Sequence, residues 1–230
     1  LSIMSKKNLK EIVYDSVLNS IYSSEYRANE IITETSLIQK YGYSKSPIRE
    51  ALTALCHEGV LKNIPRCGYQ VIALTSEDVQ KMLEYRMVLE TGMLRLCFDT
   101  ITEKQLLHLD ELSSLCSKNT EDVMEHWIYN MDFHIALLSL GGNDYACAQL
   151  KSCMNMLWRA YAQLHWNKWS HYNIPADMKY HDLILDAIRQ KRLEDAIHYL
   201  KEDLNDSGTS LGWPTLSDRP GATQNNPANN

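Results

Sequence analysis

The stretch "YGYSKSPIREALTALCHEGVL" (41–61) restricts the fold more than any other part of the chain. The segment before it, "ETSLIQKYG", predicts a short helix that ends at Gly42, because glycine most easily takes the left-handed conformation found at helix ends. A second helix follows, with Ser46 as its predicted cap and Pro47 at its first position, where a missing N–H costs nothing. Its apolar face is formed by Ile48, Leu52 and Leu55. Two helices joined by a tight turn indicate a helix-turn-helix.

The hydrophobic pattern changes period directly after this motif. The sequence "VLKNIPRCGYQVIAL" (60–74) alternates apolar and polar residues around a Pro-Arg-Cys-Gly turn, which predicts a two-stranded hairpin. A hairpin directly behind a helix-turn-helix is a wing. An amphipathic helix with apolar positions from Leu9 to Ile21 precedes the motif. Residues 1–74 are therefore predicted to form a winged helix-turn-helix domain.

The chain from residue 76 to about 206 shows helical spacing almost throughout, without hairpin signals. The predicted helices are 76–97, 102–116, 120–139, 143–168, 175–190 and 193–206. This pattern indicates an all-α bundle over 75–206. Residues 207–230 are rich in Pro, Gly, Asn and Ser and are predicted to be a disordered tail. The expected fold class is mainly α, a winged helix-turn-helix followed by a helical bundle.

Charge is unevenly distributed along the sequence. The net charge is −6, but residues 1–74 carry 9 Lys/Arg against 7 Asp/Glu, whereas the remainder carries 14 against 22. A mildly basic front and an acidic rear fit a protein in which only the front approaches phosphate. No apolar run has membrane-spanning length, no secretory leader is visible, and the six cysteines show no CxxC spacing. These features predict a cytoplasmic protein with reduced thiols and no membrane partner.

The predicted second helix carries polar and basic side chains at its start. The first turn of a recognition helix faces base edges and phosphates in the major groove, and a wing tip reaches the adjacent backbone or groove. Arginine can fork onto guanine or phosphate, while serine hydroxyls and free helix N–H groups suit phosphate oxygens. The alternative is a capped surface helix whose basic residues are merely solvated. The candidate DNA-binding residues are Ser44, Lys45, Ser46, Arg49, Arg66 and Gly68.

Residues 9–74 resemble the winged helix-turn-helix of GntR-family transcriptional regulators. The segments that carry the resemblance are "ETSL", "GYSKSPIREAL", "HEGVL" and "PRCGYQV". Three positions depart from the family pattern. Lys45 stands where arginine is usual, Thr35 stands where some relatives carry arginine, and Asn29 replaces a turn glycine. Asparagine tolerates left-handed backbone, so the turn is expected to persist.

The rear of the chain resembles the FCD subgroup of that family, whose opening helix is similar to "LEYRMVLE" (83–90). The subgroup binds a metal through an Asp-x-x-x-His pair and two later histidines. The resemblance implies that the ligands here are Asn130, His134, His181 and Asp203. Asn130 replaces the aspartate and Asp203 replaces the last histidine, so a divalent ion (Zn, Ni or Mn) is expected to be held more loosely. The alternative is a degenerate site that binds no ion.

The resemblance also implies a small effector, an organic acid or sugar acid, that completes the coordination of the metal inside the bundle. Arg86 and Arg159 are the candidates to balance its charge, and Trp158 and Tyr161 are candidates to line the cavity. The alternatives are structural, because Arg86 can pair with Glu90 one turn further along its helix and aromatic residues at helical spacing commonly form core.

These observations predict a transcription factor that binds a near-palindromic double-stranded DNA operator as a homodimer. Because repression is commoner than activation in the family, the resemblance implies a repressor. The rear domain would pair the subunits and couple effector binding to operator affinity. One rival interpretation is a metal-dependent hydrolase that uses the Asn/His/His/Asp set, although no general base stands out. Another is a metal-free interaction module with a vestigial DNA-binding front.

Overall fold

The computed structural model describes residues 8–118, 123–169 and 179–209. Within them the chain forms two compact units. One comprises the chain up to Thr75 together with Trp158–Asn167, and the other comprises the remaining described residues. No described helix is long and apolar enough to cross a membrane. All six cysteines are free thiols, as predicted.

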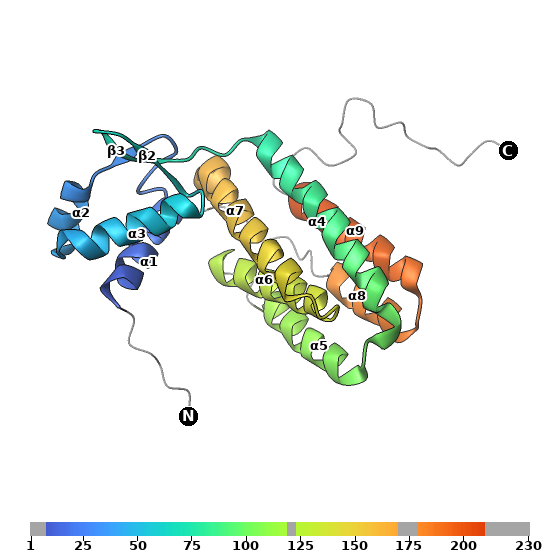
Figure 1. Cartoon of the computed structure of the whole chain (residues 1–230). Coiled ribbons are helices and arrows are strands. Elements are labelled where there is room, and N and C mark those ends of the chain that lie inside the picture. The colour runs from blue at the N-terminus through green and yellow to red at the C-terminus, as the bar shows by residue number, and fades with distance from the viewer. Residues whose placement is uncertain (1–7, 119–122, 170–178, 210–230) are drawn as a thin grey trace. The chain divides into compact units, whose positions relative to one another are not determined.

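The first unit is a small helical domain with a three-stranded sheet (Figure 1). Its elements are α1 (Leu9–Tyr22), β1 (Ile31–Ile32), α2 (Glu34–Tyr41), α3 (Lys45–His57), β2 (Leu61–Ile64) and β3 (Gly68–Val71). The strands are antiparallel in the order β1-β3-β2, so the predicted hairpin of β2 and β3 is the wing. The apolar faces of α1 and α3 meet in the core, which includes Val13, Val17, Ile21, Ile48, Leu52 and Leu55.

Two residues adopt the left-handed backbone conformation at the helix end and the turn where the sequence predicted it. Gly42 closes α2 at φ 71°, and Asn29 takes φ 67° in the turn where the family uses glycine. The predicted start of α3 was wrong by two residues. The helix begins at Lys45 with Ser44 at the cap position, and Ser46 lies in the first turn, where its hydroxyl donates to Glu50 at 2.9 Å.

The sequence did not predict β1, whose two residues pair with β3 at Tyr69 and Gln70. This strand explains the glycine at position 68. A Cβ atom there would lie 2.6 Å from the carbonyl oxygen of Ile32, and the backbone has φ +135°. Gly68 is therefore required by the close approach of the wing to β1, whatever its distance from DNA.

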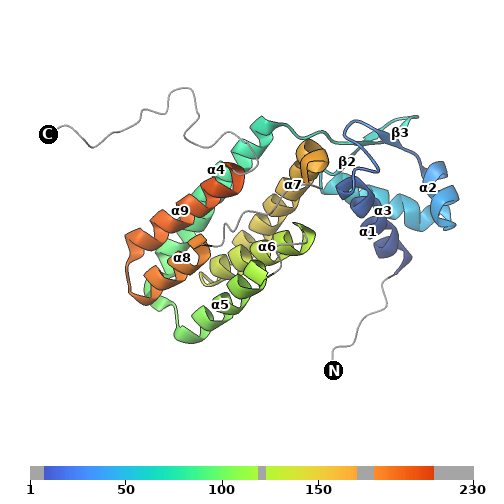
Figure 2. The same cartoon turned by 180° about the vertical axis from the view of Figure 1, so that it is seen from behind.

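The second unit is an antiparallel helical bundle. Its elements are α4 (Ser76–Cys97), the short 3-10 helix η1 (Phe98–Thr100), α5 (Glu103–Lys118), α6 (Val123–Ser139), the first part of α7 (Asp144–Trp169), α8 (Lys179–Arg189) and α9 (Leu193–Thr209). The segment Trp158–Asn167 of α7 groups with the first unit. Helices α8 and α9 form a hairpin, and α4 lies along α9 (Figure 2). α5 packs on α6 and α8, and α4 also contacts α6. A core that includes Leu94, Phe133, Ile184 and Leu200 joins α4, α6, α8 and α9.

The predicted helices are found with bounds shifted by a few residues. The helix predicted over 76–97 agrees with α4, whereas α9 continues to Thr209, beyond its expected end at residue 206. The beginnings of the helices expected over 120–139 and 175–190, and residues 210–230 of the expected tail, lie outside the described residues.

Candidate DNA-binding surface and candidate metal centre

The start of α3 presents the predicted polar residues on the surface of the first unit. Ser44, Lys45, Ser46 and Arg49 are all exposed. Ser44 adopts the extended conformation of a cap residue, but its side chain does not accept a hydrogen bond from the helix. The N–H groups of the first turn and the hydroxyl group of Ser44 thus remain available to an anion such as a phosphate oxygen.

The carboxylate of Glu34 pairs with both basic residues of α3 that are predicted to bind DNA, Lys45 and Arg49. Glu34, the first residue of α2, accepts hydrogen bonds from Arg49 Nε at 2.8 Å and Arg49 Nη2 at 3.2 Å. Lys45 Nζ lies 3.4 Å from Glu34 Oε2, and the hydroxyl group of Tyr69 donates to Oε1 at 3.4 Å. The hydrogen bond from Arg49 is the main cause that lowers the pKa of Glu34, so the carboxylate is ionised at neutral pH.

A surface pocket of about 520 Å³ lies between α3 and the wing. Its walls include Glu34 and Arg49 on the helical side and Arg66 and Gly68 on the wing side. Arg66 is exposed in the left-handed conformation at φ 66°. The six predicted DNA-binding residues therefore lie at the start of α3 and at the wing tip, and their contact with DNA stays a prediction.

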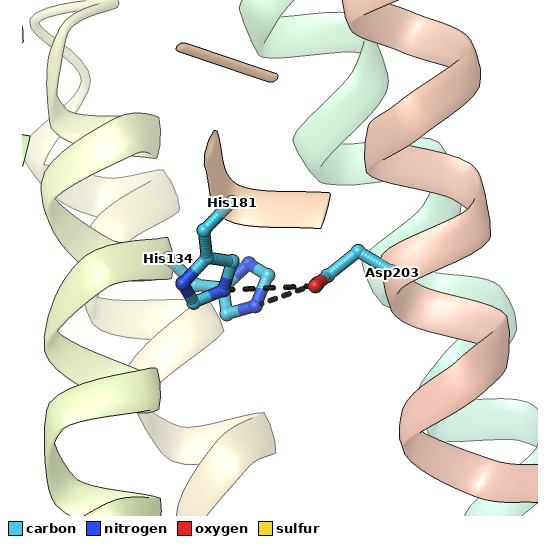
Figure 3. A group of neighbouring side chains, drawn as sticks. All are labelled: His134, His181 and Asp203. Atoms are coloured by element: carbon cyan, nitrogen blue, oxygen red, sulfur yellow. Dashed lines mark ion pairs between the residues drawn. The ribbon is translucent and has the colours of Figure 1, made fainter. Parts of the chain in front are cut away.

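Three of the four predicted metal ligands converge inside the bundle (Figure 3). His134 comes from α6, His181 from α8 and Asp203 from α9, and their ligand atoms lie within 4.8 Å of one another. His134 Nε2 is 3.1 Å from Asp203 Oδ2, and His181 Nε2 is 3.6 Å from Asp203 Oδ1. All three side chains are buried. Asn130, the fourth predicted ligand, is half-buried one turn before His134 on α6, and its ligand role stays a prediction.

His181 lies in this cluster without a hydrogen bond to its ring. Its side chain is fully buried, and neither ring nitrogen has a hydrogen-bond partner. The ring stacks on Phe133 at a centroid distance of 3.7 Å, which fixes its orientation. Burial lowers the pKa of His181 to about 3, against the opposing effect of Asp203, so the imidazole is neutral. A neutral imidazole beside a carboxylate has the protonation state that metal binding requires, and the ligand role of His181 stays a prediction.

His134 is oriented by a residue that the sequence did not assign to the site. Its Nδ1 lies 2.7 Å from Glu90 Oε2, and Arg86 Nε donates to Glu90 Oε1, also at 2.7 Å. The three side chains are 1–3% exposed. Since Glu90 accepts from Nδ1, Nε2 is directed at Asp203, which is the arrangement in which a carboxylate orients a metal-bound histidine. The i,i+4 spacing predicted the Arg86–Glu90 pair, but the contact with His134 joins residues 44 positions apart.

The buried charges of this network stabilise one another. Burial alone would raise the pKa of Glu90 and Asp203, but the charges of Arg86 and His134, together with hydrogen bonds from His134, outweigh it and keep both carboxyl pKa values low. Burial alone would lower the pKa of His134, but Glu90 and Asp203 raise it above its usual value. Without a metal, His134 lies between two carboxylates that favour its protonated form. A divalent cation fits the same place, because two nitrogen donors and one oxygen donor converge there.

The four predicted effector residues do not share one environment. Arg86 borders the candidate metal centre through Glu90, and its buried Nη2 has no hydrogen-bond partner. Trp158, Arg159 and Tyr161 belong to the segment that groups with the first unit. The ring of Trp158 contacts that of Tyr22 at a centroid distance of 5.9 Å. Burial lowers the pKa of Arg159, and the nearby side chains of Tyr22 and Glu58 oppose that shift. The effector role of these three residues stays a prediction.

Comparison with known proteins matches both parts of the chain. Residues 9–71 match the model of bacterial regulatory proteins of the gntR family, and residues 81–206 match that of the FCD domain. The chain belongs to the GntR family. It is 28% identical to the HTH-type transcriptional regulator YdhC of Bacillus subtilis over 200 residues, which is 84% of this chain and 86% of YdhC. It is 35% identical to the gluconate operon transcriptional repressor of Bacillus licheniformis over 71 residues, 31% of this chain and 29% of the repressor.

Solved structures agree with the fold of this GntR-family protein. The structure of E. coli McbR/YncC aligns with a TM-score of 0.68 at 21% identity and covers 90% of this chain and 98% of McbR/YncC. The relatives are named as transcriptional regulators, which confirms the prediction of a DNA-binding regulator of the GntR family with an FCD domain. The same finding argues against the hydrolase interpretation.

Proposed function

We propose that this GntR-family regulator represses transcription as a homodimer on a near-palindromic operator and that a divalent metal in its FCD domain receives a small carboxylate effector. The observation that carries the proposed metal site is the convergence of ligand atoms from His134, His181 and Asp203, among them the buried Nε2 of His181, which has no hydrogen-bond partner. Buried polar atoms are nearly always satisfied, so an imidazole nitrogen without a hydrogen bond among other ligand atoms favours a cation as its partner.

The donor set indicates which ions fit. Two imidazole nitrogens and one carboxylate oxygen, with the amide oxygen of Asn130 as the proposed fourth donor, suit Zn²⁺, Ni²⁺ or Mn²⁺. The metal would supply a positive charge and open coordination positions for an oxygen ligand. The residues of the chain do the rest, since Glu90 orients His134 and Phe133 orients His181.

Arg86 supports a carboxylate as the effector. Its guanidinium is 1% exposed, and Glu90 occupies Nε, while Nη2 has no hydrogen-bond partner. An anion that reaches the proposed metal could also accept a hydrogen bond from this buried N–H donor, which would otherwise stay unsatisfied. The relative from Bacillus licheniformis is named as a repressor of a gluconate operon, which favours sugar acids as the first compounds to test and repression as the direction of control.

A second copy of the chain is the proposed partner of α4. Tyr85, Val88, Gly92 and Leu96 follow one another at helical spacing on the outer face of this helix, and Val88 and Leu96 are 75% and 82% exposed. Gly92 has open space around its Cβ position, so another helix can approach closely there. A two-fold axis across this apolar face would give two winged units for two half-sites.

The test begins with the protein purified without chelator. Elemental analysis should find about one divalent ion per chain, and His181→Ala should lose it while His198→Ala, at an exposed histidine, keeps it. DNase footprinting on the DNA upstream of the gene should show a protected near-palindrome that sugar acids release. A parent protein without metal would remove the metal site from the proposal, and unprotected DNA would remove the operator.

A further inference from the structure

We propose that Glu34 sets the base specificity of this regulator by holding Arg49 side-on, so that the end of the guanidinium faces a guanine. The proposal rests on operator binding by the start of α3. It assigns a role to the acidic residue of the "ETSL" segment, which is not itself a candidate DNA contact. Glu34 would act through Arg49 and is therefore a positioning residue.

The hydrogen bonds between the two side chains use one defined edge of the guanidinium. Arg49 Nε donates to Glu34 Oε1 at 2.8 Å, and Arg49 Nη2 donates to Oε2 at 3.2 Å. Arginine has five N–H donors in a rigid plane, so the two N–H groups of Nη1 and the second of Nη2 remain unused by this pair. Those N–H groups form the terminal fork, which matches the O6 and N7 acceptors of guanine in the major groove.

Glu34 is itself held in place by two elements other than α3, namely α2 and β3. It is the first residue of α2, directly after the cap residue Thr33, and its side chain is only 19% exposed. The hydroxyl group of Tyr69, on β3 of the wing, donates to Oε1 at 3.4 Å. Arg49 by contrast is 57% exposed and projects from α3 next to the surface pocket. A fixed carboxylate thus orders the long side chain of Arg49 before DNA arrives, which lowers the entropic cost of the base contact.

The charge of Glu34 also bears on binding to DNA of any sequence. Its carboxylate lies 3.4 Å from Lys45 Nζ as well, so two of the cations nearest the start of α3 are partly neutralised. A negative charge near the groove lowers the affinity for the phosphates of every duplex. The oriented Arg49 raises the affinity only for duplexes that have a guanine at the position it faces. Both effects widen the difference between operator and random DNA.

A purely structural role makes a different prediction. If Glu34 only ties α2 to α3, its loss would weaken binding to all duplexes equally. The experiment compares the parent protein with Glu34→Gln and Glu34→Asp on two probes. One is a duplex that the parent selects from a randomised pool, together with variants substituted at each guanine, and the other is a random-sequence duplex of equal length.

Glu34→Gln removes the charge and keeps the shape of the side chain. We expect it to bind the random duplex more tightly and to steepen the log–log salt dependence by about one unit, because Lys45 and Arg49 become free for phosphates. Discrimination at one guanine position should fall about 10-fold. Glu34→Asp keeps the charge but is too short to hold both nitrogens, so it should lose discrimination without gaining affinity for the random duplex.

The matched control is Glu25→Gln, which removes the same charge from a pair with Lys40 at 2.6 Å and touches neither Lys45 nor Arg49. Its discrimination should equal that of the parent. Unchanged discrimination in both Glu34 variants, or an equal loss of affinity for both probes, would overturn the role of Glu34 and leave operator binding by α3 intact. If the parent selects no duplex, operator binding fails and the inference fails with it.

Discussion

The contact between Glu90 and His134 predicts that Glu90 contributes to the affinity of the proposed metal site. Glu90→Gln replaces a carboxylate acceptor with an amide, which weakens the orientation and basicity of His134. We expect metal affinity to fall about 10- to 100-fold, measured by competition with a chromophoric chelator. Glu77→Gln is the control, because Glu77 forms an exposed pair with Lys81 on the same helix. An unchanged metal affinity in Glu90→Gln would show that the hydrogen bond from His134 to Glu90 does not contribute to metal binding.

The two buried histidines predict the pH dependence of stability in the metal-free protein. The folded pKa of His181 is lowered from 6.5 to about 3, so stability falls as the pH drops below 6.5, where the unfolded state takes up a proton that folded His181 does not. The folded pKa of His134 is raised above 6.5, so its contribution is complete below 6.5 and is lost as the pH rises through the folded pKa. Stability should therefore peak near pH 6.5.

Urea unfolding in chelator at pH 5 to 8 measures this optimum, with a limiting slope of about 1.4 kcal/mol per pH unit for each histidine. Zn²⁺ should flatten the alkaline side, because the ion replaces the proton between His134 and Asp203. His198→Gln serves as the control, since this side chain is exposed. A metal-free protein whose stability rises steadily from pH 6.5 to 8 would contradict the charged state assigned to His134.

At the scale of elements, the wing depends on the close approach of β3 to β1. Gly68→Ala would place a Cβ atom 2.6 Å from the carbonyl oxygen of Ile32 at a φ of +135°. We expect a local loss of about 2 kcal/mol, seen as hydrogen exchange at least tenfold faster for amides in β1 and β3. Gly59→Ala is the matched control, because Gly59 also has positive φ but open space around its Cβ position. Its loss should be about 1 kcal/mol. Equal effects would mean that the approach to β1 is unimportant.

The elements also separate what the sequence could predict from what it could not. Long amphipathic periods and the glycine turn gave α3, the wing hairpin and the bundle helices, because these signals are local. β1 has only two residues and no alternation of its own, and it exists because β3 pairs with it. The start of α3 was misplaced because Ser44 and Ser46 have the same capping chemistry, and local propensity cannot choose between them.

The candidate metal centre shows the same division. Spacing against the family pattern placed His134, His181 and Asp203 together, which the structure reproduces. The role of Glu90 depends on packing of α4 against α6, and i,i+4 spacing could reveal only its pair with Arg86. Contacts that join distant segments carry no periodic signal, so residues that orient a ligand are harder to find from sequence than the ligand itself.

At the scale of the whole molecule, the proposed dimer makes a prediction that joins the FCD domain to operator binding. Val88→Asp would put a charge in the middle of the apolar face of α4, where the side chain is 75% exposed in the single chain. Since that face is not part of the core of the chain, the substitution should leave the fold intact and abolish self-association. Sedimentation velocity should show a change from dimer to monomer, with unchanged circular dichroism. Leu107→Asp on α5, where leucine is 56% exposed, is the control and should remain dimeric.

The same variant then tests whether pairing produces operator affinity. A dimer binds two half-sites but loses translational freedom only once. A monomer should therefore bind the full operator about 100-fold or more weakly than the parent dimer, while its affinity for an isolated half-site should be unchanged. Fluorescence anisotropy on the two duplexes measures the ratio. If Val88→Asp stays dimeric, the interface lies elsewhere on the chain. If it is monomeric and still binds the full operator as tightly as the parent, each winged unit recognises DNA independently, and the metal centre could not act on the operator through the spacing of the two units.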